Sequence, residues 1–275
     1  EGQTGMTVAG VSQKVMDRYA NWIRENGHID GGVLPPPVTE FCMAKGRNDP
    51  QGRIVVGWMG RPLEDKGLMT LPYLLAENPR LIVRAWTGAE TAGLDYTQRV
   101  QGEAMEAVLK LARKLGVEDR LDIRPLDFNA LSYRHRLEGC HVLLGNSRKE
   151  GFLLTAAEAL SCGIPVVVTK TCGIADFIKG GHNGYLIDWN DNPKRLAKIA
   201  HRAILKAAKL DPVKCLASVD QLSLGSNYAS AYRPVLANLT HTGLQHENAR
   251  VTVGVRIHEG VDTSFLDDAI NSIAA

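Results

Sequence analysis

Short apolar strands alternate with amphipathic helices through most of the chain, and this alternation constrains the fold more than any other feature. The pattern predicts strands at 54–59, 81–87, 121–124, 141–145, 164–169 and 185–187. It predicts helices at 68–77, 99–115, 129–137, 152–162 and 174–178, with two closing helices at 192–209 and 214–237. Such regular alternation is typical of an α/β domain with a parallel, doubly wound, Rossmann-like sheet.

A shorter strand and helix precede this domain. Residues 6–11 read as a strand, and Ser12 is placed to cap a helix that ends near Gly27. The predicted apolar face of this helix consists of Val15, Tyr19, Trp22 and Ile23. Consecutive prolines make 33–38 extended, and the polar stretch 44–53 is predicted to be an interdomain linker.

Composition excludes several classes of protein. The 275 residues are 44% hydrophobic and 23% charged with a net charge of +2, which is ordinary for a globular chain and gives no reason to expect a nucleic-acid partner. Five scattered cysteines without a C-x-x-C pair predict reduced thiols in the cytoplasm rather than a disulfide or zinc framework. No apolar run in the sequence approaches the length of a membrane span.

Ligands of open parallel sheets bind beyond the carboxyl ends of the strands. The loops that follow the predicted strands are 60–67, 88–98, 125–128, 146–152 and 170–176. The most informative stretch is Ser147–Thr169, which reads as a loop, a helix and a buried strand. Glu150 stands before its helix and Glu158 stands inside it.

Glu158 lies off the apolar stripe of its predicted helix, which consists of Leu153, Ala156, Ala157 and Leu160. Because helix side chains lean toward the N-terminus, its carboxylate should point back toward Glu150, where it would suit a diol such as a ribose. Taken alone, a solvent-facing glutamate on an amphipathic helix is the favoured interpretation.

Glu150 and Gly151 stand at a predicted helix start. The glycine lets backbone approach a ligand closely, and the unpaired amides of Phe152 to Thr155 would attract phosphate. A glutamate beside phosphate has to face something neutral, such as sugar hydroxyls. The alternative is a favourable charge–dipole placement worth about 0.3–1 kcal/mol, and the residues alone fit both interpretations equally.

A second polar cluster, G-R-P-L-E-D-K-G at 60–67, follows the first strand of the predicted sheet. Arg61 suits bidentate contact with phosphate oxygens, and Lys66 acts as a point charge. For this loop alone, solvated charges partly paired with Glu64 and Asp65 are the favoured interpretation.

Taken together, these segments resemble a known family. G-R-P-L-E-D-K-G, S-R-K-E-G-F-L-L-T-A-A-E-A-L-S-C-G-I-P-V-V-V and G-H-N-G-Y-L-I-D occur in the order and spacing of retaining GT-B glycosyltransferases of family four, over about residues 52–237. In that family, the C-terminal Rossmann-like domain holds a nucleotide-diphosphate sugar. The resemblance implies the same substrate here without a metal or other cofactor, in agreement with the lack of D-x-D and of metal-spaced histidines.

The resemblance also implies roles for individual residues. The expected catalytic residues are Glu150, Arg61 and Lys66. The expected donor-binding residues are Gly60, Arg61, Lys66, Arg124, Pro125, Leu126, Glu150, Gly151, Phe152, Leu153, Leu154, Thr155 and Glu158. Arg61 and Lys66 would hold the diphosphate with help from the amides of Leu154 and Thr155, while Arg124 to Leu126 would lie along the base.

The sugar-side residues of the family pattern follow. Glu150 would face the hexose hydroxyls, Gly151 and Phe152 would offer backbone to the sugar, and Glu158 would hold the ribose. Two positions depart from the pattern: Leu153 stands where the family usually has a second glycine, and Asp176 stands where glutamate is commoner. The first departure predicts a tighter or shifted sugar-side loop.

The same resemblance predicts three parts of the chain. Residues 1–51 resemble the end of an acceptor-side N-terminal domain and its linker, and 52–237 the donor-binding domain. Residues 238–275 would be a linker and the first β-α unit of a second enzyme, because 251–275 resembles the start of a family-two GT-A glycosyltransferase. A strand and helix that pack back on the main domain are the equally weighted alternative. Because the rest of the acceptor domain would precede residue 1, the chain is expected to be a truncated donor-binding part.

The expected activity is transfer of a sugar with retention to an acceptor hydroxyl in polysaccharide or other surface-glycan synthesis. The acceptor would be a glycan or a lipid-linked sugar. The alternatives are a nucleotide-sugar-binding module without activity and a GT-B-type sugar-nucleotide epimerase. The expected location is the cytoplasm, with the inner face of the membrane as the alternative. For the predicted helix at 192–209, a solvated face is favoured over contact with anionic lipid; its cations are Lys194, Arg195, Lys198, Arg202, Lys206 and Lys209.

Overall fold

The computed structural model describes residues 7–27, 29–36, 38, 43–44, 52–87, 95–125 and 133–222. The chain divides into two compact units, Glu1–Asn238 and Leu239–Ala275. Most of the predicted linker, Leu126, the end of the last predicted helix and the whole of 238–275 lie outside the described residues. The domain boundaries inferred from the sequence therefore stay predictions.

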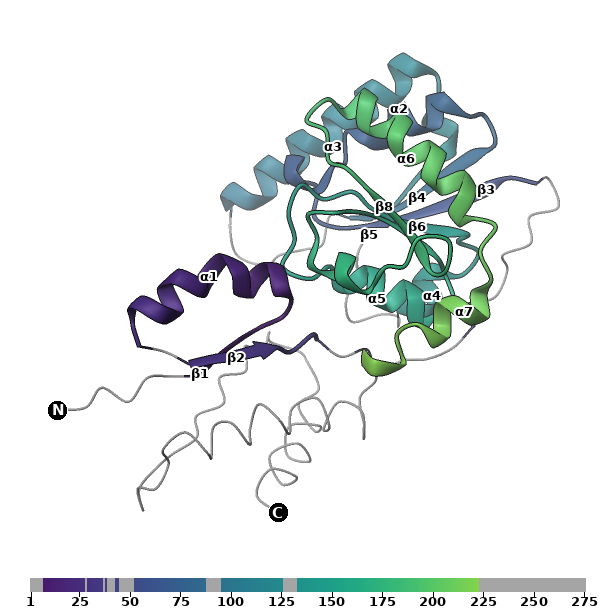
Figure 1. The fold of residues 1–275 in the computed structure, drawn as a ribbon. Helices are drawn as coiled ribbons and strands as arrows, with labels where there is room; N and C mark the ends of the chain where they lie inside the picture. The colour runs from purple at the N-terminus through teal and green to yellow at the C-terminus, as the bar shows by residue number, and fades with distance from the viewer. Residues whose placement is uncertain are drawn as a thin grey trace. The chain divides into compact units, whose positions relative to one another are not determined.

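A six-stranded parallel sheet forms the body of the first unit, in the order β5-β4-β3-β6-β7-β8 (Figure 1). Its strands are β3 (Ile54–Met59), β4 (Leu81–Thr87), β5 (Leu121–Pro125), β6 (Val142–Gly145), β7 (Val166–Thr169) and β8 (Gly184–Ile187). Each strand lies within two residues of its predicted bounds. The predicted fold class, a doubly wound Rossmann-like α/β sheet, is confirmed.

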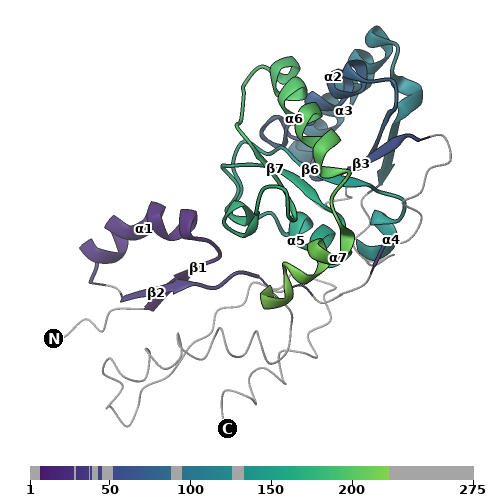
Figure 2. The same cartoon turned by 45° about the vertical axis from the view of Figure 1, so that its right-hand side comes forward.

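Helices cover both faces of this sheet (Figures 1 and 2). One face carries α2 (Thr70–Glu77), α3 (Asp95–Leu115) and α6 (Pro193–Ala207). The opposite face carries α4 (Tyr133–Leu137), α5 (Leu154–Ser161) and α7 (Pro212–Ala217). Short 3-10 turns occur at η1 (Glu64–Lys66), η2 (Glu118–Arg120), η3 (Gly173–Phe177) and η4 (Asp220–Leu222).

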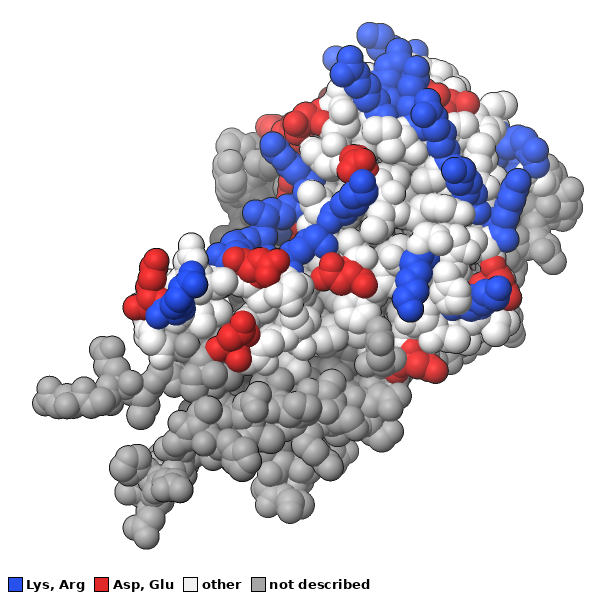
Figure 3. Space-filling model, in the orientation of Figure 1, with Lys and Arg blue, Asp and Glu red and all other residues white. Residues whose placement is uncertain are grey.

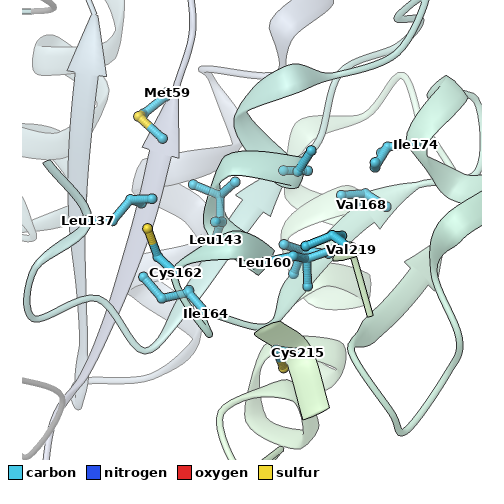
Figure 4. Packing of buried hydrophobic residues seen from close by; sticks show 14 of the residues in the cluster. Met59, Leu137, Leu143, Leu160, Cys162, Ile164, Val168, Ile174, Cys215 and Val219 are labelled. Atoms are coloured by element: carbon cyan, nitrogen blue, oxygen red, sulfur yellow. The ribbon is translucent and has the colours of Figure 1, made fainter. Parts of the chain in front are cut away.

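The sheet separates two hydrophobic clusters, because alternate residues of a strand face opposite sides. In β7, Val166 and Val168 belong to the cluster beneath α5, whereas Val167 belongs to the cluster beneath α2 and α6. Figure 4 shows part of the first cluster, in which Leu143 of β6 lies with Leu160 of α5. Burial of both faces explains why the central strands β6 and β7 read as apolar runs, whereas β4 and β5, toward the edge of the sheet, include charged residues.

The order of the strands reverses between β3 and β6. β3 pairs with β4 along its whole length, and its other edge pairs Val56 with Val142 and Gly57 with Leu143 of β6. The chain first builds outward from β3 through β4 and β5, and then returns to build outward in the other direction from β6. Doubly wound sheets bind their ligands at such a reversal.

A β-α-β segment precedes the sheet, made of β1 (Thr7–Gly10), α1 (Gln13–Glu25) and β2 (Ile29–Val33), with the two strands parallel. The predicted apolar face of α1 is partly wrong. Met16 and Ile23 are buried, whereas Tyr19 and Trp22 are 48% and 45% exposed. The Met16 sulfur packs against Gly10 of β1, so the face of α1 that carries Met16 is the buried one. The helical period alone does not determine which face is buried.

The last predicted helix, 214–237, is too long: α7 already ends at Ala217. The Ser218 hydroxyl donates to the Cys215 carbonyl over 2.7 Å and accepts from the side-chain amide of Asn183 over 3.0 Å. These bonds fix the chain as it leaves the helix. One of them depends on a residue in a distant loop, which a local pattern cannot reveal.

Four cysteines, Cys140, Cys162, Cys172 and Cys215, are free and buried. Burial raises the pKa of Cys140 and of Cys172 to about 11, so both thiols stay protonated at neutral pH and are poor nucleophiles. No helix in the described ranges has the length and apolar character that a membrane span requires.

Candidate functional site

The loops that follow β3 and β6 lie side by side, because these strands pair at the reversal of the sheet. Asn146, fully buried, joins them: its side-chain amide donates to the Gly67 carbonyl over 2.9 Å, and its oxygen accepts from the Trp58 indole over 2.9 Å. The Arg148 amide adds a bond of 2.6 Å to the Asp65 carbonyl. The two loops are therefore held in one arrangement.

Gly67 permits this approach of the two loops. Its φ of +72° lies in the left-handed region, where glycine is favoured. A Cβ at this position would come within 2.5 Å of the Asn146 carbonyl oxygen. A side chain here would push apart the two loops that Asn146 joins.

Lys66 and Glu150 meet across these loops. The Lys66 Nζ lies 2.6 Å from Glu150 Oε1, and the side chains are 12% and 24% exposed. The Ser147 hydroxyl donates to the same carboxylate oxygen over 3.2 Å, while the Asp65 carboxylate is 3.7 Å from Nζ. A short, partly buried bond between opposite charges holds both side chains firmly. The expected partial pairing of Lys66 with Asp65 is present at 3.7 Å, but its shorter contact is with Glu150 on the neighbouring loop, and the lysine is largely buried rather than solvated.

The backbone that follows Glu150 is held through its carbonyl groups. The Glu150 carbonyl accepts from the Gly173 amide over 3.2 Å, and the Phe152 carbonyl accepts from the Ile174 amide over 2.7 Å. Within the described part of the chain, the amides of 152–155 donate to no acceptor. These free donors open α5 beside the Lys66–Glu150 pair and suit an anionic group.

Leu153 has a left-handed backbone, with φ +86° and ψ +71°, and among the described residues it is the only non-glycine with a positive φ. Its side chain packs with the cluster beneath α5 and over Gly145, where a Cβ would come within 2.4 Å of Leu153 Cδ2. Such a conformation stores about 1–3 kcal/mol of strain and is maintained by its surroundings. The sequence had predicted a tighter or shifted loop here.

Comparison with known proteins identifies the family. The model described as Glycosyl transferases group 1 matches residues 54–211, which is more than half of the chain. The chain belongs to this family. D-inositol 3-phosphate glycosyltransferase of Streptomyces bingchenggensis is 34% identical over 142 residues, which cover 49% of this chain and 28% of that protein. Sucrose synthase of Melioribacter roseus is 30% identical over 155 residues, 49% of this chain and 19% of that protein.

Solved structures of GT-B glycosyltransferases share the fold. The lipopolysaccharide outer core galactosyltransferase WaaB has a TM-score of 0.66 and 18% identity, with 85% of this chain and 62% of that chain covered. HepE of Anabaena, in complex with UDP and glucose, has a TM-score of 0.62 and 18% identity, with coverages of 86% and 63%. The group 1 chain thus spans less than two thirds of the length of these proteins.

The structure brings together part of the predicted site of this group 1 member. Gly60, at the end of β3, donates to the Trp86 carbonyl over 3.1 Å, and Arg61 next to it is exposed. Phe152 is buried edge-on against Phe177, with the ring centroids 5.7 Å apart. Leu154 is 41% exposed. These residues stand on the two loops that meet at the reversal.

Other predicted residues stand apart from this centre. Arg124 forms an ion pair of 2.8 Å with Asp122 on β5, two strands from β3. Pro125 ends that strand, and Leu126 lies outside the described residues. Glu158 is half-buried on α5, within the first two turns after the free amides.

Sequence reasoning did not give Ser12, Asn146, Ser147 or Gly173 a role at the site. Asn146 and Ser147 fall within the loop 146–152 that the strand pattern had selected, so their polar side chains directly after a buried strand were the available signal. Ser12 was interpreted as a helix cap alone. Among the described residues, no group of three or more His, Cys, Asp or Glu side chains could hold a metal ion.

Leu153→Gly should leave the chain more stable than Leu153→Ala by about 1 kcal/mol, because both lose the side chain and glycine alone relieves the left-handed strain. Urea unfolding measures the difference. At Leu160, inside α5, the same two substitutions should rank in the opposite order, because glycine weakens a right-handed helix. The same ranking at both positions would contradict the strain at Leu153.

Proposed function

We propose that the chain binds a nucleotide-diphosphate sugar and serves its transfer, with retention, to an acceptor hydroxyl. The observation that carries this proposal is the Lys66–Glu150 pair of 2.6 Å beside the free amides at the start of α5. A cation and unpaired amides suit a diphosphate, whereas a carboxylate suits neutral hydroxyls. Both chemistries stand together at the reversal of a doubly wound sheet.

The proposed roles follow from this placement. Lys66, Arg61 and the amides of Leu154 and Thr155 stabilise the diphosphate as negative charge develops on it during departure. Glu150 accepts from the hexose hydroxyls, with the backbone of Gly151 and Phe152 beside the sugar. Glu158 binds the ribose, and the loop from Arg124 to Leu126 lies along the base, with Gly60 and Leu153 as neighbours of the donor.

We propose that the protein's part in this reaction is mainly electrostatic stabilisation. We propose front-face attack by the acceptor within an ion-pair-like transition state, with Glu150 as the residue beside the reacting sugar. The reaction would require no metal or other cofactor. Structures of HepE contain UDP, glucose and UDP-glucose, which supports a uridine diphosphate sugar as the first donor to test.

Surface-glycan synthesis is the proposed setting, and the name of the neighbouring lipopolysaccharide galactosyltransferase supports it. We further propose that 52–237 bind the donor, that 1–51 belong to the acceptor side, and that 238–275 begin a second enzyme. The alternatives, a binding module without activity and a sugar-nucleotide epimerase, share the donor site and differ in the products they form.

Calorimetric titration with UDP, GDP and ADP tests the donor site. We expect binding of at least one, and Lys66→Ala should weaken it about ten- to hundredfold, because a hydrogen bond to a charged group is lost. Lys198→Ala, at an exposed lysine of α6, is the matched control and should bind as the wild type does. No binding at millimolar concentration, or unchanged affinity of Lys66→Ala, would contradict the proposal.

Turnover measurements test whether sugar transfer requires an acceptor-side domain. The purified chain with donor and acceptor should transfer sugar far more slowly than the chain joined to an acceptor-side domain, because binding of the acceptor is proposed to lie there. Nuclear magnetic resonance of the product should show the anomeric configuration of the donor. Turnover by the chain alone at rates typical of whole enzymes, or an inverted product, would refute this part of the proposal.

For location we propose the cytoplasm, with a solvated basic face on α6. Figure 3 shows Lys and Arg side chains gathered along the surface over α6. The helix contains no Asp or Glu, so contact with anionic lipid at the inner membrane face is the alternative. We expect no co-sedimentation with phosphatidylglycerol vesicles at about 0.15 M salt. Binding that Lys198→Glu abolishes would favour the membrane instead.

A further inference from the structure

We propose that Ser12 is a positioning residue for the sugar side of the donor site. This inference rests on the proposed function and extends the site beyond the residues that the family model matches, 54–211. Ser12 is fully buried, and its hydroxyl donates to the Gly151 carbonyl over 2.7 Å. The contact joins the start of α1 to the loop between Glu150 and α5.

A hydroxyl supplies one donor and two acceptor positions. The Ser12 oxygen also accepts from the Val15 amide over 3.4 Å, as the cap of α1. One side chain therefore both begins α1 and holds Gly151. Its single hydroxyl proton is donated to the Gly151 carbonyl.

Fixing a carbonyl fixes the amide on its other side. In a trans peptide, the C=O of one residue and the N–H of the next point in opposite directions. Because the Gly151 carbonyl is held toward Ser12, the Phe152 amide of the same peptide points away from α1. This amide is the first of the free donors that open α5.

Two neighbouring peptides are held in the same way, by the amides of Gly173 and Ile174 on η3. Those donors are backbone groups and belong to any residue except proline. Ser12 differs because its donor is a side chain. Three consecutive peptides are thus oriented from outside, and one of these bonds can be removed by a single substitution.

The Gly173 side of this bond is closely packed. A Cβ on Gly173 would come within 2.0 Å of the Gly151 carbonyl oxygen and 2.5 Å of Ser12 Oγ. Methyl groups of Val11 and Val15 lie 3.6 and 3.8 Å from the Cβ position of Gly151. The bond therefore lies between the start of α1 and η3, and its donor, Ser12, is fully buried.

A nearby ion pair does not replace it. Lys14 Nζ lies 3.0 Å from Asp176 Oδ1 and also connects α1 with η3, but these side chains are 35% and 40% exposed. Exposed pairs of this kind contribute little because water screens them. The directional contact with the loop is the one from Ser12.

The inference predicts a selective effect on the sugar. Gly151 and Phe152 face the hexose in the proposed assignment, whereas the diphosphate is held by Lys66 and by amides further along α5. Loss of the Ser12 hydroxyl should therefore weaken UDP-glucose binding about three- to tenfold, the range for one hydrogen bond, and change UDP binding less than about twofold.

Ser12→Ala and Ser12→Gly test this with calorimetric titration of UDP and UDP-glucose. Glycine is tolerated as a helix cap, so Ser12→Gly removes the hydroxyl while α1 stays folded, which circular dichroism checks. Asn192→Ala is the matched control. The Asn192 side chain caps α6 by accepting from the amides of Lys194 and Arg195, and it lies outside the proposed site. This substitution should leave both affinities unchanged.

The outcomes separate the two proposals. If the wild-type chain binds neither UDP nor UDP-glucose, the proposed function fails for this donor and the inference fails with it. If the wild type binds both and the Ser12 variants lose UDP-glucose affinity alone, the inference is supported. If the variants bind UDP-glucose as the wild type does, or lose both ligands equally, Ser12 does not position the sugar side and the inference is overturned.

Discussion

The pairing of β3 with β6 is the constraint on which the candidate site depends. Because the chain leaves these neighbouring strands in opposite directions, the loops after them end side by side without covering each other. Asn146 fixes the two loops relative to each other, because its buried side chain accepts a hydrogen bond from Trp58 and donates one to Gly67. Breaking either bond leaves a buried polar group unpaired, which disfavours any other arrangement of the loops.

Charge is arranged at this place before any ligand arrives. Lys66 and Glu150 compensate each other at 2.6 Å while both are mostly buried, so neither carries an isolated charge in the protein interior. Under the proposed function, a diphosphate would offer Lys66 a second partner, and sugar hydroxyls would offer Glu150 hydrogen-bond donors. Donor binding would then exchange one set of charged hydrogen bonds for another between groups that are already positioned.

Much of the fold could be predicted from the sequence, because the strands are short, mostly apolar segments that alternate regularly with helices. The loops at the carboxyl edge, and with them Lys66 and Glu150, followed from the same reasoning. That these two side chains touch did not follow, since it depends on the strand order. Family resemblance, rather than periodicity, placed them in one site.

The remaining features are tertiary. Leucine is disfavoured in a left-handed conformation, so the local sequence at Leu153 does not predict its positive φ. The Leu153 side chain packs over Gly145, where a Cβ would leave no room for it, and the bonds from η3 hold the neighbouring peptides. Ser12 reaches Gly151 from 139 residues away in sequence. Its local pattern explained the helix cap and gave no sign of its second partner. The buried side of α1 likewise depends on Gly10 rather than on the helical period.

The pairing of β3 also has a consequence for how the chain is made. One edge of β3 finds β4 soon after synthesis, but the other waits for β6, whose first partner residue is Val142 opposite Val56. During that interval a strand of apolar residues presents unpaired backbone groups, a condition that favours association with other chains. Contacts so distant in sequence also slow folding. β3 therefore gains partners on both edges only after the chain has been synthesised as far as β6.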